Sequence, residues 1–180
     1  MNPIRQRRLN IVVAVGLALG AVFGLAGSLV VQANLRSTFW GIGGSGLVMA
    51  AALLSVKFFR KECDFVAAGF LVFAIGEAVM LSGTAASLAG SIPSFAAGTA
   101  LWATALLLIS IPKVFAIAVR LLGIISAILF AITAIQIFAG HPLSPISSPL
   151  PFFAYPFLVL TFLGWIWTLL QENHLMESSQ

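Results

Sequence analysis

Residues 65–84 read FVAAGFLVFAIGEAVMLSGT and contain a single ionisable side chain, that of Glu77. A membrane-spanning helix needs about 20 mostly apolar residues, because each residue adds about 1.5 Å to a helix and the hydrocarbon core of a bilayer is about 30 Å thick. The length and composition of this stretch therefore predict a transmembrane helix with one acidic residue inside it.

The rest of the chain repeats this pattern of apolar runs separated by charged or turn-forming residues. The runs predict six spans, at approximately residues 11–31, 39–56, 65–84, 95–111, 121–139 and 152–170. No connecting segment is long enough to fold independently. We therefore expect residues 1–180 to form one membrane domain, an all-α integral membrane protein built as a six-transmembrane-helix bundle with no soluble domain.

Composition points to the same class of protein. The chain is 61% hydrophobic and 8% charged, whereas a soluble domain has about 25% charged residues. A net charge of +4 would suggest a nucleic-acid partner in a soluble protein, but no basic stripe interleaved with aromatic residues is present. The lipid bilayer is therefore the expected partner, and nucleic acid is not.

The basic residues predict the orientation of the spans. Short cytoplasmic loops of membrane proteins are enriched in Lys and Arg. With the N-terminus in the cytoplasm, only Arg36 falls outside, and the remaining basic residues fall inside: Arg5, Arg7, Arg8, Lys57, Arg60, Lys61, Lys113 and Arg120. We therefore expect a plasma-membrane protein, of the bacterial inner membrane, with both termini cytoplasmic.

The start of the fifth span admits two predictions. Proline is well tolerated in a first helical turn, so one helix could run from Pro112 to Ala139. That helix would be about 40 Å long, which exceeds the thickness of the bilayer core. Alternatively, residues 112–119 form a short interfacial segment, with Lys113 and Arg120 directed toward the headgroups. The interfacial segment is the preferred prediction.

Small residues recur at fixed spacing in two of the spans. Such residues let helix backbones approach closely, and van der Waals contact is a main source of helix association in lipid. The predicted packing residues are Gly16, Gly20, Gly24 and Ser28 in the first span and Gly69, Gly76 and Gly83 in the third. Contact within the chain is favoured, and contact with a second subunit through the first helix remains open.

Glu77 is the candidate functional residue. A carboxyl group at bilayer depth costs at least about 2.5 kcal/mol, so it usually faces protein or a water-filled cavity. Counting 1.5 Å per residue brings Thr104, Thr133 and Thr161 to about its depth. Gln136 falls on the same broad face of the fifth span as Thr133. We expect a small, mostly apolar cavity around Glu77, in which these groups help to bind a solute or a proton.

A short motif in the second span raises the possibility of catalysis. Residues Gly43-Gly44-Ser45-Gly46 look like the Gly-x-Ser-Gly string of rhomboid proteases. That chemistry needs a histidine base on a facing helix, but His141 lies in a loop and His174 lies in the tail. The string therefore favours close helix packing, and we expect no enzyme.

Cofactors and metals are not expected either. Cys63 is the single cysteine, so the chain can form no internal disulfide and contains no Cys-x-x-Cys motif. The predicted spans separate Cys63, Glu77 and the histidines in depth, so they cannot form a tetrahedral metal site. Phosphate-binding loops and dinucleotide fingerprints are also missing from the sequence.

Two hypotheses about function follow. The first is a small transporter or solute-binding bundle with a midplane site around Glu77. The alternative is a non-catalytic accessory subunit that packs against a larger membrane complex, or a homo-oligomer formed through the first helix. The sequence identifies neither the solute nor the partner.

Overall fold

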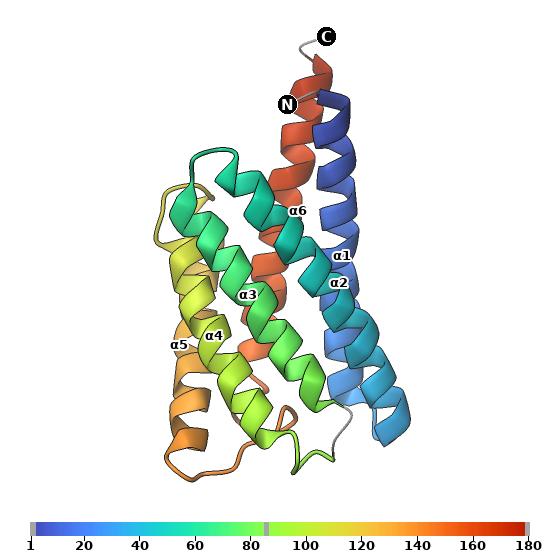
Figure 1. The fold of residues 1–180 in the computed structure, drawn as a ribbon, viewed down its shortest axis with the longest axis vertical. Helices are drawn as coiled ribbons and strands as arrows, with labels where there is room; N and C mark the ends of the chain where they lie inside the picture. The colour runs from blue at the N-terminus through green and yellow to red at the C-terminus, as the bar shows by residue number, and fades with distance from the viewer. Residues whose placement is uncertain (1–2, 85–86, 179–180) are drawn as a thin grey trace.

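The computed structural model describes residues 3–84 and 87–178, and the side chains of residues 4–84 and 87–175. Within these ranges the chain is all-helical and contains no strand. Its elements are α1 (Pro3–Leu29), α2 (Ala33–Phe59), α3 (Asp64–Gly83), α4 (Ile92–Ser110), α5 (Ile117–Phe138) and α6 (Ala154–Ser178) (Figure 1). All six helices are long and apolar enough to cross a membrane. The predicted number of helices is confirmed.

The helices form a closed ring in chain order. Each helix packs against the next one along the chain, and α6 packs against α1. The first residues of α1 and the last residues of α6 lie at the same end of the bundle (Figure 1). The connections α1–α2, α3–α4 and α5–α6 therefore lie at the opposite end.

Aromatic side chains from several helices fill the interior of this ring. Phe70 of α3 contacts Trp165 of α6 edge to face, with 4.9 Å between ring centroids. Phe73 stacks on Trp102 of α4 at 5.0 Å, and Trp102 contacts Phe130 of α5 at 5.2 Å. These rings are buried, so the centre of the bundle is a packed core and not a pore.

Glycine contacts join neighbouring helices, as the spacing of small residues predicts. A Cβ atom added to Gly16 of α1 would lie 2.6 Å from the carbonyl oxygen of Gly46 in α2. A Cβ atom on Gly76 of α3 would lie 3.1 Å from the carbonyl oxygen of Gly98 in α4. The backbones therefore come into contact at both crossings, and Gly16 and Gly76 pack within the chain.

Of four other glycines predicted to pack, three contact a neighbouring helix or side chain and one does not. Gly20 packs on Leu47, Gly69 on α4, and Gly83 on Ser94. Gly24 differs, because a Cβ atom there would meet nothing within 4 Å. Together with Ser28, Gly24 lines a cavity described below.

The connection between α4 and α5 excludes one of the two predictions made for it. Residues 111–116 are not helical and α5 begins at Ile117, so the single helix from Pro112 to Ala139 is wrong, and the interfacial segment stays a prediction. The Arg120 guanidinium donates hydrogen bonds of 2.7 Å to the carbonyl oxygens of Ser110 and Ile111. Phe115 is buried and contacts Phe58 and Phe70. These contacts hold the segment against the bundle and end α4 before Pro112.

Candidate functional site: the cavity at Glu77

The Glu77 side chain points from α3 toward α2, and it is only 7% exposed. Successive residues on a helix are about 100° apart. Because Gly76 packs on α4, its neighbour Glu77 is rotated onto the face that meets α2. There the carboxyl group lies against Gly44, where an added Cβ atom would be 2.5 Å from Glu77 Oε1. The prediction that this residue faces protein is confirmed.

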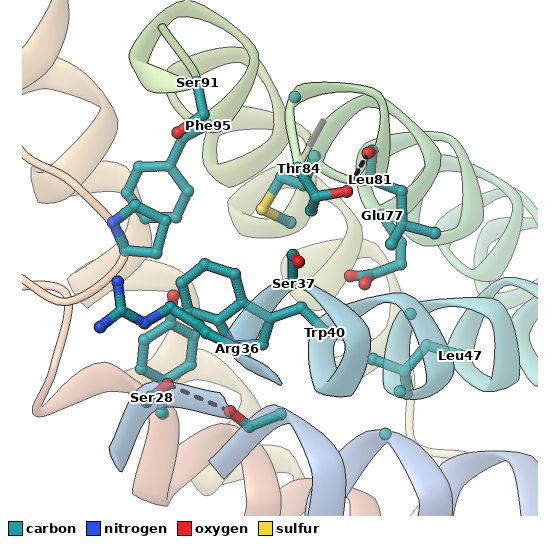
Figure 2. Close-up of a pocket in the computed structure, with 18 of the residues that line it drawn as sticks. Ser28, Arg36, Ser37, Trp40, Leu47, Glu77, Leu81, Thr84, Ser91 and Phe95 are labelled. Carbon is teal, nitrogen blue, oxygen red and sulfur yellow. Dashed lines mark hydrogen bonds between the residues drawn. The ribbon is translucent and has the colours of Figure 1, made fainter. Parts of the chain in front are cut away.

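A cavity of about 190 Å³ adjoins Glu77. Its lining comes from every helix except α5, together with residues of the α3–α4 and α5–α6 connections. The cavity therefore extends from Glu77 toward the end of the bundle where those connections lie. Figure 2 shows the Glu77 carboxyl group directed into the space between α2 and α3, with Trp40 and Ser37 of α2 nearby.

The walls of this cavity are mainly apolar and aromatic. The rings come from α2, α4 and α6 and belong to Trp40, Phe95, Trp102, Tyr155 and Phe162. Tyr155 of α6 lines the same cavity as Glu77 of α3. The Glu77 carboxyl group therefore lies in surroundings that solvate a charge poorly.

Two polar atoms beside this cavity lack partners. In the described part of the chain, the buried side-chain polar atoms without a hydrogen bond are Glu77 Oε2 and Trp102 Nε1. Both residues line the cavity. Because more than about 90% of buried polar groups in proteins are hydrogen-bonded, an unpaired atom calls for an explanation such as a water, an ion or a ligand. The two atoms themselves are closed off from a water-sized probe, whereas other parts of both side chains line the cavity.

Three of the hydroxyl groups in the lining donate hydrogen bonds to their own helices or turns. Ser28 donates to the carbonyl oxygen of Gly24 at 3.1 Å, Thr84 to that of Leu81 at 2.7 Å, and Ser91 to that of Leu88 at 2.8 Å. They lie at the ends of α1, α3 and α4. Their oxygen atoms can still accept a hydrogen bond near the mouth of the cavity.

Among the described residues that line the cavity, Arg36 is the charged residue besides Glu77. Its Nε and one terminal nitrogen donate to the carbonyl oxygen of Val30 at 3.1 and 2.8 Å, and the guanidinium lies 5.9 Å from the centroid of the Trp40 ring. Among the side chains that the structure describes, it forms no ion pair with Glu77. Arg36 therefore caps the end of α1 and leaves Glu77 without a counter-charge.

The structure does not bring the other predicted binding residues to Glu77. Thr104 and Gln136 are exposed on the outside of the bundle. Thr133 and Thr161 are fully buried, but their hydroxyl groups donate to the carbonyl oxygens of Leu129 and Phe157 in their own helices. None of the four lines the cavity. Helix rise predicts depth in the membrane, but it does not predict the direction of a side chain around the helix axis.

A second buried polar cluster lies at the opposite end of the bundle. Lys57 of α2 is 2% exposed, and its ammonium group donates to Asn10 Oδ1 at 2.9 Å and to Glu172 Oε2 at 2.7 Å. Asn10 Nδ2 donates to Asn173 Oδ1 at 2.9 Å. Lys61 also pairs with Glu172, at 3.0 Å. Because these groups are mutually satisfied, the cluster joins α1, α2 and α6 as a structural contact.

Comparisons with known proteins do not assign a function to this cavity. No protein-family model matches the chain, and neither a curated protein nor a solved structure matches it. Within the described residues, no group of three or more His, Cys, Asp or Glu side chains could hold a metal ion. The function must therefore be argued from the cavity at Glu77.

Proposed function

We propose that this chain is a multi-pass membrane protein that binds a small solute in the cavity at Glu77, as a solute-binding or transport-class bundle. The observation that carries the proposal is a mainly apolar cavity lined by Glu77, a buried carboxyl group with no ion-pair partner among the described residues. A solute with a complementary group would pair with this carboxyl group.

The outer surface of the bundle supports insertion into a membrane. Large apolar side chains are exposed along several helices, including Val22 of α1 at 62%, Ile135 of α5 at 65% and Leu163 of α6 at 51%. In water such a surface would promote association, whereas in a bilayer it faces lipid tails. The excess of basic residues at the end that carries the chain termini supports a cytoplasmic location for that end.

This orientation would open the cavity to the outside. At its inner end the cavity meets Trp102 and Phe162, which belong to the aromatic core. Beyond that core the Lys57 cluster joins α1, α2 and α6. The arrangement fits capture of a solute from the non-cytoplasmic side, and transport would require a second arrangement in which the cytoplasmic end opens. Most of the small residues that favoured an accessory subunit pack within the chain, and these are Gly16, Gly20, Gly69, Gly76 and Gly83.

A thermal-shift screen of the purified protein against a broad panel of small solutes tests this proposal. We expect at least one solute to raise the melting temperature of the wild type, because a ligand that binds only the folded state stabilises it. Glu77→Gln keeps the shape of the side chain but removes its charge. The solute-induced shift in melting temperature should therefore differ from that of the wild type. Glu62→Gln is the matched control, since Glu62 is exposed in the α2–α3 connection.

Two results would contradict the proposal. One is the absence of any shift for the wild type, across the whole panel and a series of pH values. The other is an identical shift in the wild type and in a variant whose cavity has been filled.

A further inference from the structure

The lining of the cavity indicates which charge a bound solute would carry. Glu77 supplies the only carboxyl group in the lining, and its Oε2 has no hydrogen-bond partner in the described residues. A buried carboxylate is costly unless an opposite charge and hydrogen bonds compensate for its lost hydration. Arg36 does not provide that charge, because Val30 and Val31 accept its hydrogen bonds. A cationic ligand would provide it.

The walls favour a cation with a carbon body. Aromatic faces attract alkylammonium and quaternary ammonium groups through the ring quadrupole, and rings from three helices line this cavity. Leu81 lies beside the carboxyl group at Gly44, and Leu47 also lines the cavity, so both offer apolar contact. A ligand with one positive charge and an apolar remainder would match both features.

A bare metal ion matches less well. Ca²⁺ takes about six to eight oxygen ligands and Mg²⁺ takes about six. Thr84, whose hydroxyl also lines the cavity, is seven residues beyond Glu77, or about 10 Å farther along the helix axis. The single carboxyl group is therefore too isolated to complete such a coordination shell.

The volume limits the size of the ligand. Sites for drug-sized molecules occupy about 300–1,000 Å³, whereas this cavity has about 190 Å³. We propose, on the basis of the function proposed above, that the solute held at Glu77 is a compact alkylammonium ion whose ammonium group pairs with the carboxylate and whose carbon body lies against the aromatic wall.

Three probes that share a tert-butyl group test this inference, because their polar heads are cationic, neutral and anionic. They are tert-butylammonium, uncharged tert-butanol and anionic pivalate. In calorimetric titrations of the purified wild type we expect tert-butylammonium to bind at least about tenfold more tightly than tert-butanol, since a charge-assisted hydrogen bond is roughly twice as strong as a neutral one. Pivalate should not bind, because its charge repels the Glu77 carboxylate.

Substitutions at two carboxyl groups test whether the preference for the cation depends on Glu77. Glu77→Gln should abolish the preference for the cation, and the exposed control Glu62→Gln should retain it. Equal binding of tert-butanol and tert-butylammonium would overturn the ligand class, as would a cation preference that survives in Glu77→Gln. Either result would overturn only the ligand class, and the proposal that the cavity binds a solute would stand. Failure of every probe, together with a silent solute panel, would overturn the proposed function as well.

Discussion

Glu77 of α3 occupies space that Gly44 of α2 leaves free, with the position of a Gly44 Cβ atom only 2.5 Å from Glu77 Oε1 and 2.6 Å from Leu81 Cδ2. Both neighbouring atoms are the ends of flexible side chains. A methyl group at position 44 would therefore displace the carboxyl group and not the helix backbone.

The first prediction concerns Gly44→Ala. We expect the free energy of unfolding to change by less than about 1 kcal/mol, because the gain in helix propensity offsets part of the crowding. Solute affinity should fall, because the carboxyl group is displaced from its position in the cavity. Gly41→Ala is the control, since a Cβ atom there meets nothing within 4 Å. Equal solute-induced shifts in melting temperature for Gly44→Ala and Gly41→Ala would contradict this role of Gly44.

A different outcome is expected at the crossing of α1 and α2. Gly16→Ala would place its methyl group 2.6 Å from the backbone oxygen of Gly46 and 3.0 Å from Ala50 Cβ, and neither atom can move without moving the helix. We expect a loss of about 1–3 kcal/mol in stability. Gly24→Ala, on the same face but in open space, should cost nothing. Thermal denaturation in detergent compares the two variants, and similar melting temperatures would argue against a tight crossing.

The Lys57 cluster predicts unequal effects for two lysines that pair with the same carboxylate. Lys57→Met would leave Asn10 Oδ1 buried without its donor, which should cost about 1–3 kcal/mol. Lys61→Met should cost about 0–1 kcal/mol, because its side chain is 41% exposed and the pair is screened by water. Melting temperatures of the two variants provide the comparison. Equal losses would show that burial of Lys57 contributes little.

The predicted orientation can be tested in intact cells. In a Cys63→Ser background, cysteines introduced at Ser37 and Ser147 should react with a membrane-impermeant thiol reagent, since both lie at the end assigned to the outside. A cysteine at Glu62 should react only after the membrane is permeabilised. Labelling of positions 147 and 62 from the same side would overturn the six-span arrangement.

Several features of this fold follow directly from the sequence. The six apolar runs predict the six helices because a run of about 20 apolar residues is long enough to cross a bilayer as a helix. Gly16 and Gly76 predict close crossings because only small residues permit backbone contact. The insertion cost of Glu77 predicts that its carboxyl group avoids lipid, and the structure buries it.

The remaining features depend on packing between distant segments. Thr104 has the depth expected of a site residue, but the rotation of α4 turns it outward. Arg120 and Phe115 end α4 and shape its connection to α5 through tertiary contacts that no local pattern reveals. The aromatic lining also gives no signal in the sequence, because Trp102 and Tyr155 resemble other aromatic residues of the spans. Only the glycines at positions 43, 44 and 46 indicate where α2 meets close neighbours.

The most direct test of the account is a measurement of solute binding after the cavity has been filled. Gly24 lines the cavity, and a Cβ atom there meets nothing within 4 Å, so Gly24→Leu should place its side chain in the cavity without a clash at the backbone. Gly41→Leu introduces the same side chain where a Cβ atom is equally free, outside the cavity lining. We predict that calorimetric titration with tert-butylammonium shows at least about tenfold weaker binding to Gly24→Leu and unchanged binding to Gly41→Leu. Wild-type affinity in Gly24→Leu would contradict the claim that the solute occupies this cavity.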